Sequence, residues 1–429
     1  MKALALVWGL AILMPYPALP VGASTGVQFA HLMIALLLPL ALINRASIPR
    51  AWFFYLFIST AQITSLLVHG MQQVDLNATI INLFALLAIP VTALMFRFQP
   101  RAMLTGVALM MGVHGVIGLI QYLAFQQNEF PFGWLYVNPS FAQLTPEWLL
   151  VYAEYVKRPF GLFPEPSSLL AAVGPWLVML IAAMFDTSRQ DDGKRCLGPM
   201  PLMLTAVALM GTLMIMSASG ALLFVAGGAT LVLAVMTYRN GTRRPVMTGL
   251  VIVTAIAAGI ALIGFLGARA DSEFAQASGS WFERLSSIRL GLDVIARSDL
   301  LDLWLGYGAG HVSYLAGKLG ALDAVQSWML SHIVANGLFG AIGLLVCALL
   351  VLHAVSRTSD PLIWLICLAV WVAGPLVVTA YQDLFGIWAF IALPLAVADR
   401  AVNPRVTLRA TEFRRQLQYR QPAYRGQVA

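Results

Sequence analysis

Long apolar runs, each about as long as a helix that crosses a bilayer, dominate the chain. A helix needs roughly 20 mostly apolar residues to span the hydrocarbon core. The runs predict twelve spans, near residues 3–21, 26–44, 51–69, 77–96, 102–125, 167–185, 200–217, 219–237, 246–267, 327–354, 362–380 and 384–398. Three prolines interrupt the first run and a second run follows almost at once. We therefore expect a retained span or a re-entrant element there, not a cleaved signal peptide.

Two connections between the predicted spans are much longer than the others. They cover residues 126–166 and 268–326, and alternating spans place both on the same side of the membrane. The predicted fold is an all-α, polytopic transmembrane helical bundle over residues 1–398. Its two long loops are expected to contain short amphipathic helices, and a basic tail follows over residues 399–429.

Composition and charge fit this picture and orient it. Of the 429 residues, 60% are hydrophobic and 10% are charged, whereas a soluble domain typically has about 25% charged residues. Basic short loops stay in the cytoplasm, and cytoplasmic termini place 19 of the 26 basic residues on that side. The other seven all lie in the two long loops: Lys157, Arg158, Arg269, Arg284, Arg289, Arg297 and Lys318. Basic residues kept on that side, against the usual bias, indicate that they have a function. The alternative is that they are solvated loop surface with local ion pairs.

Several kinds of chemistry have no support in the sequence. No Asp, Glu, Lys or Arg falls near the centre of a predicted span, whereas ion-coupled transporters usually need such groups. Histidines in the spans are expected to be packing or interhelical bonding residues. The three cysteines permit no disulfide framework in the long loops, and no metal-ligand spacing or nucleotide-binding motif is present. We therefore expect no metal, no cofactor and no nucleic acid, and a tail that either contacts anionic lipid or is disordered.

The first long loop predicts a helix followed by a stiff segment. Thr145, Pro146 and Glu147 form a helix start, and the helix is expected to lie in the membrane interface up to about residue 157. Prolines and a glycine then hold residues 158–166 in a non-helical shape. This fixes Arg158 and Glu165 at the mouth of the next span. Glu165 is a candidate base, or alternatively a helix-end charge.

The second long loop predicts a helix over residues 281–298. Leu285, Ile288, Leu292 and Ile295 form its apolar stripe. Arg289, Asp293 and Arg297 follow one another on a flanking face, and Arg284 lies on the opposite flank. Two arginines in line can bind a diphosphate, because guanidinium groups bond phosphate oxygens in pairs. Alternatively, Asp293 pairs with both.

These segments resemble the Wzy-type bacterial polysaccharide polymerases and their relatives, the O-antigen ligases. The matching features are RPFGLFPEPSS at 158–168, SASGALL at 217–223, IRLGLDVIARSDLLDLWLGYGAGH at 288–311 and NGLFG at 336–340. Each motif alone is weak, and it is their order and spacing over residues 158–345 that carries the resemblance. The resemblance implies a GT-C-like membrane glycosyltransferase of the bacterial inner membrane, with its active site facing the periplasm.

The resemblance also implies the substrates and the partners. A growing glycan on undecaprenyl diphosphate is the expected donor, and the sugar hydroxyl of a new lipid-linked repeat is the acceptor. Chain-length regulators and export proteins are further expected partners, beside membrane lipids. The expected roles are a base and catalytic groups at Glu165, Arg158 and His332, and diphosphate or substrate binding by Arg284, Arg289, Arg297, His311 and Tyr307.

Two other functions compete with polymerisation. Ligase-like relatives place a histidine about eleven residues before the glycine of the GLFG element, where this chain has Gln326. The first competitor is a ligase that transfers the finished glycan to lipid A core or protein, and this departure weakens a direct carry-over of the ligase histidine's role. His311 and His332 are candidate substitutes, but neither is aligned with that histidine. A flippase for the same lipid-linked glycan should have a polar cavity among its spans, whereas this chain concentrates charge in two loops.

Overall fold

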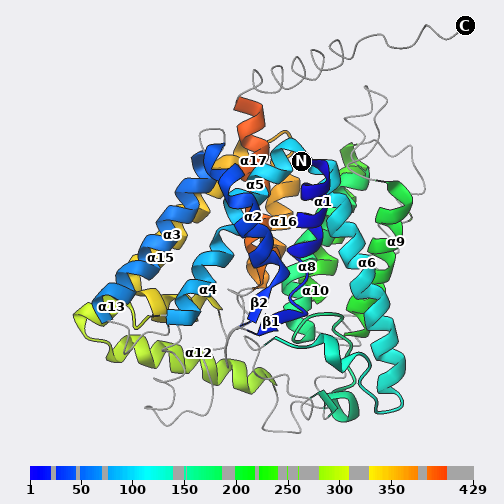
Figure 1. The fold of residues 1–429 in the computed structure, drawn as a ribbon, viewed down its shortest axis with the longest axis horizontal. Coiled ribbons are helices and arrows are strands. Elements are labelled where there is room, and N and C mark those ends of the chain that lie inside the picture. The colour runs from blue at the N-terminus through cyan, green and yellow to red at the C-terminus, as the bar shows by residue number, and fades with distance from the viewer. Residues whose placement is uncertain are drawn as a thin grey trace, which may run out of the picture.

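The computed structural model is a bundle of helices with one short pair of strands (Figure 1). It describes residues 1–20, 26–44, 49–69, 76–138, 149–150, 152–185, 199–217, 222–239, 249, 259, 280–308, 328–374 and 384–402. The elements are α1 (Lys2–Ala11), β1 (Ala18–Pro20), β2 (Gly26–Gln28), α2 (Phe29–Ile43), α3 (Pro49–His69), α4 (Leu76–Leu86), α5 (Ala88–Phe98), α6 (Pro100–Phe125), η2 (Gly133–Leu135), η4 (Tyr152–Val156), α8 (Pro166–Phe185), α9 (Met200–Met216), α10 (Leu222–Arg239), α12 (Ser280–Arg297), α13 (Leu300–Leu305), α15 (Trp328–Ser356), α16 (Pro361–Ala373) and α17 (Phe385–Val402).

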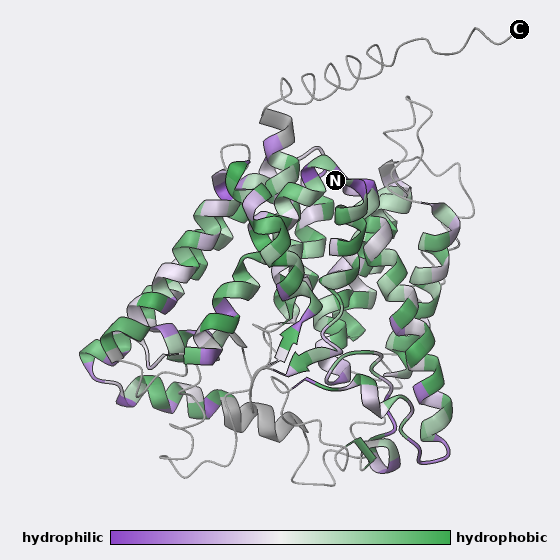
Figure 2. Cartoon of the chain, viewed as in Figure 1, coloured by the Kyte–Doolittle hydropathy of each residue, from purple (hydrophilic) through white to green (hydrophobic). Residues whose placement is uncertain are grey.

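The architecture is that of an all-α membrane protein. Within the described ranges, five helices are long and apolar enough to cross a membrane: Pro49–Val68, Thr79–Phe98, Pro100–Phe125, Pro166–Met184 and Met329–Ser356. Shorter apolar helices accompany them, and apolar residues cover the bundle (Figure 2). A helix lies at each predicted span except 246–267, most of which falls outside the described residues. The number of spans stays a prediction.

The first predicted span is shorter than expected. Helix α1 ends at Ala11, and β1 pairs antiparallel with β2, with Ala18 opposite Gln28. Proline removes a backbone donor and cannot continue a helix, so Pro15, Pro17 and Pro20 end the run that hydrophobicity alone would extend to residue 21. The strand pair is also an addition to the predicted all-α fold.

Helix α1 is nevertheless built firmly into the bundle, because it packs closely on α6. A Cβ on Gly9 would lie 2.1 Å from the Met103 carbonyl oxygen, and one on Gly106 would lie 2.1 Å from the Leu6 carbonyl oxygen. Small residues at a crossing let two helix backbones approach, which is how helices associate inside a membrane. This contact fixes α6, the helix that holds the candidate site.

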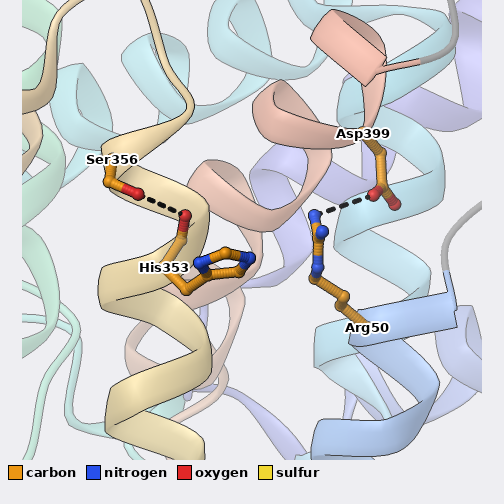
Figure 3. Close-up of polar contacts among 4 residues, drawn as sticks. All are labelled: Arg50, His353, Ser356 and Asp399. Atoms are coloured by element: carbon orange, nitrogen blue, oxygen red, sulfur yellow. Dashed lines mark hydrogen bonds and ion pairs between the residues drawn. The ribbon is translucent and has the colours of Figure 1, made fainter.

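The two ends of the bundle differ. The N-terminus and the end of α17 lie at one end, and α12 lies across the other (Figure 1). At the first end, Arg50 of α3 contacts Asp399 of α17 with 3.4 Å between Nη1 and Oδ1, beside the end of α15 that contains His353 and Ser356 (Figure 3). This ion pair ties two helices that are distant in sequence.

Helix α15 is broken at Gly337, where φ is 60°. A break of this kind frees carbonyls of the preceding turn from their helical partners. The amides of Tyr307 and Gly308 bond those carbonyls, with 2.9 Å to Val334 O and 2.8 Å to Ala335 O. The segment after α13 is thereby anchored to the interior of α15.

Glycine is required at this crossing. A Cβ on Gly306 would lie 2.4 Å from the Ala335 backbone, and one on Gly337 would lie 2.4 Å from the Trp304 carbonyl oxygen. Both glycines also have positive φ, which side chains rarely adopt. Gly306, the first glycine of the GYGAGH stretch at 306–311, therefore serves backbone contact with α15.

Candidate functional site

Residues 160–162, hereafter the pinned segment, lie in the middle of the RPFGLFPEPSS stretch and are held by Gln121 of α6. The Gln121 side-chain oxygen accepts hydrogen bonds from the amides of Phe160 (3.0 Å) and Gly161 (2.9 Å). Its amide nitrogen donates to the Gly161 carbonyl at 3.1 Å. Gln121 is fully buried, so one side chain bonds three backbone groups of the pinned segment, which buried backbone groups require.

Two further side chains complete this polar cluster. Leu162 N donates to His114 Nδ1 at 3.1 Å, so the ring proton is on Nε2, which donates to the Leu13 carbonyl at 2.7 Å. The Tyr136 hydroxyl donates to the Gly161 carbonyl, and burial raises the pKa of that hydroxyl, which keeps it a donor. His114 is thus a buried bonding residue that joins α6 to two segments outside the helices, whereas interhelical bonding or packing was predicted for histidines in the spans.

Gln121→Leu should lower the thermal stability of the purified protein. The substitution leaves the Phe160 and Gly161 amides buried and unbonded, at a cost of about 1–3 kcal/mol for each. Gln126→Leu is the matched control, because Gln126 is exposed at the end of the same helix. Thermal unfolding in detergent measures both. Equal melting temperatures for the two variants would contradict the holding role of Gln121.

The pinned segment leads to Glu165 at the start of α8. Glu165 is half-buried, and its Oε1 accepts hydrogen bonds from the hydroxyls of Ser167 and Ser168, the latter at 3.3 Å. Among the described residues nothing bonds Oε2, and Arg158 forms no ion pair with Glu165. One carboxylate oxygen is thereby oriented by the helix start, and the other is left for a further partner.

The arginine row of α12 consists of Arg289 and Arg297 with Asp293 between them. All three side chains are exposed. Within the described part of the chain, Asp293 forms no ion pair with either arginine. The structure therefore does not have the alternative arrangement, in which Asp293 pairs with both. Both guanidinium groups are available to an anion.

The burial of α12 differs from the predicted pattern. The helix begins and ends within one residue of the predicted bounds. Among residues 288–297, whose burial is described, Gly291 and Val294 are buried and Ile295 is half-buried, whereas Ile288 and Leu292 of the predicted apolar stripe are exposed. The Ile288 and Leu292 side chains of the stripe therefore do not face the core, because the small and branched residues at 291 and 294 pack there instead.

The other predicted site residues are placed separately. The Tyr307 hydroxyl donates to Ser298 Oγ at 2.9 Å, and burial raises its pKa. His332 is buried within α15, 3.2 Å from the Asn336 amide nitrogen. The Arg284 side chain and all of His311 lie outside the described residues. No described contact joins Glu165 to the arginine row.

The first-loop helix is described only in part. Residues 149–150 are helical, and Tyr152–Val156 forms a turn of π-helix. The predicted start at Thr145, Pro146 and Glu147 lies outside the described residues. Leu149 is buried and Tyr155 is 73% exposed, so the described turn has one face against the bundle and an aromatic ring directed outward.

The sequence did not predict the polar contacts of Gln121 and Tyr136 with Gly161, which are hereafter called the holding cluster. A signal was present, because a glutamine inside an apolar span needs buried partners.

Among the described residues, no group of three or more His, Cys, Asp or Glu side chains lies close enough together to hold a metal ion.

Comparison with known proteins identifies no relative. No protein-family model matches the chain, and no curated protein matches it. The sequence motifs and the described contacts around Glu165 and α12 are therefore the features that indicate a function.

Proposed function

We propose that the chain polymerises undecaprenyl-diphosphate-linked oligosaccharide repeat units into an exopolysaccharide at the periplasmic face of the bacterial inner membrane. The observations that support it are the exposed arginines of α12, which have no ion pair within the described residues, and the half-buried Glu165 carboxylate that is oriented at the start of α8 of an apolar bundle. A lipid diphosphate needs cations for its phosphates and an apolar surface for its tail. A sugar acceptor needs a base.

In the proposed reaction, the acceptor hydroxyl oxygen attacks the anomeric carbon of the donor glycan. The glycosidic bond forms as the bond between that carbon and the diphosphate oxygen breaks. Glu165 takes the hydroxyl proton, and undecaprenyl diphosphate leaves with the bonding electron pair. Arg158, Arg289 and Arg297 stabilise the charge that develops on the leaving diphosphate. The holding cluster positions the pinned segment, and with it Arg158 and Glu165.

The test is to incubate purified protein with lipid-linked repeat units alone. A ladder of glycan lengths is the expected product. A product only after adding lipid A core or an acceptor protein would indicate a ligase. Movement of the lipid-linked unit across vesicles without any longer glycan would indicate a flippase.

The proposed orientation has its own test. We expect a cysteine introduced by Ala277→Cys to react with a membrane-impermeant reagent in intact spheroplasts, and one introduced by Ala423→Cys in the tail to be protected. The reason is that this orientation keeps 19 of the 26 basic residues in the cytoplasm. Variants are made in a background without the native cysteines. The reverse labelling pattern would show that the chain has the opposite orientation in the membrane.

A further inference from the structure

Helices α12 and α13 present an apolar surface that the described part of the chain leaves exposed. Ile288 is 39% exposed and Leu292 is 56% exposed on α12. On α13, Leu300 is 74% exposed and Trp304 is 47% exposed, with Leu301 between them also exposed. A soluble surface rarely gathers large apolar side chains in this way.

The depth of α13 indicates what covers this surface. The segment after α13 bonds the carbonyls of Val334 and Ala335, and α15 is apolar from Met329 onward. Ala335 lies just before the break at Gly337, so its depth is read from α3, which its carbonyl contacts. Ser65 Oγ, 3.3 Å from the same Ala335 carbonyl, lies about 6 Å inside the end of α3. The segment joined to α13 is therefore at the depth of the outer part of a lipid leaflet.

The apolar surface is also continuous with the sides of the spanning helices. Helix α13 packs on α15 and α3. Leu67, at the adjoining end of α3, is 77% exposed, and Met329, at the start of α15, is 37% exposed. Side chains of this kind on a spanning helix face lipid tails, so the same lipid reaches α13.

The order of side chains on α12 fits a helix lying in the interface. Each exposed charged residue of the arginine row directly follows an exposed apolar or small one: Arg289 follows Ile288, Asp293 follows Leu292 and Arg297 follows Ala296. Successive residues are about 100° apart around a helix. One row therefore faces the acyl region while the neighbouring row lies at the level of the headgroups, which is the pattern of an interfacial helix.

We propose that α12 and α13 form a platform seated in the lipid leaflet at this end of the bundle, with the arginine row bound to lipid phosphates. Figure 1 shows α12 lying across the bundle, as such a seat requires, and Figure 2 shows apolar residues along its described part. The platform does not depend on any transfer reaction. It also gives a lipid diphosphate a lateral route to the arginines, from the leaflet and not from water.

Nitroxide labels on full-length protein in vesicles of zwitterionic and anionic phospholipid test the platform. Labels are placed by Leu292→Cys, Leu300→Cys and Asp293→Cys in the background without native cysteines, and collisions with oxygen and with a water-soluble nickel chelate are compared. Leu345→Cys on the lipid side of α15 and Glu129→Cys in the first loop give the lipid and water references. Labels at 292 and 300 should shift toward the lipid reference, and the label at 293 should stay nearer the water reference.

Two outcomes would overturn the platform. If labels at 292 and 300 match the water reference, the surface is solvated. If they are immobilised and shielded from both reagents, a protein or a second copy of the chain covers it. A second arm uses Arg289→Gln together with Arg297→Gln, which should make the label at 292 shallower in anionic vesicles. An unchanged depth of this label would show that the arginine row does not bind lipid phosphates. Because no glycan is measured, a failed polymerisation assay leaves these results standing.

Discussion

Replacing Glu165 by Gln should reduce glycan chain extension by about 10²–10⁴-fold, the range that general-base catalysis supplies. The structure makes this substitution selective. The amide oxygen of Gln can still accept the hydrogen bonds that Ser167 and Ser168 donate to Oε1. The helix start is then retained while the basic group is lost. Glu165→Asp should retain more activity, and donor binding should change little in either variant.

The matched control for Glu165 is Ser168→Ala. It removes one of the hydroxyl donors and leaves the carboxylate, so it should alter the stability of the helix start and leave most of the chain extension. Glycan ladders from the purified variants, checked first for monodispersity and donor binding, measure the difference. Near-normal ladders from Glu165→Gln would show that the carboxylate only supports the start of α8.

The sequence predicted where helices lie better than how they pack. Periodicity placed α12 within one residue of its observed bounds, because alternation of apolar and polar positions is a local property. Which face of α12 is buried depends on Gly291 and Val294 meeting the bundle, and no local pattern contains that contact. The three prolines after residue 14 indicated that α1 ends early, but the predicted span was drawn from hydrophobicity and so extended to residue 21.

The holding cluster shows a second limit of sequence reasoning. Gln121 and Gly161 are 40 residues apart, and their contact exists only because the first long loop returns to α6. The motif around residue 161 was recognised as stiff from its prolines, yet its stiffness also comes from side chains of another helix. The arginines of the candidate site could be proposed from sequence because all seven basic residues on the predicted outer side lie in the two long loops, while the short outer loops have almost none.

Replacing either Arg289 or Arg297 by Ala should lower chain extension by about 10²–10³-fold, as the loss of one donor to a developing anion does. Lysine at these positions should restore little, because an ammonium group cannot form the paired bonds of a guanidinium. Asp293→Asn is the matched control. It lies between the two arginines and pairs with neither in the described structure, so extension should stay close to that of the unaltered protein.

The arginine variants also separate diphosphate binding from membrane seating. If the arginines act on the diphosphate, each single Ala variant loses affinity for the lipid-linked donor while the nitroxide depth at residue 292 changes little. If they act only by seating α12, the depth changes and the donor affinity follows it. Chelation of divalent cations should leave extension intact, because guanidinium groups carry the charge of the leaving diphosphate in this mechanism. Loss of extension with chelator and its return with magnesium would contradict that role, since the metal would then be the group that stabilises the leaving diphosphate.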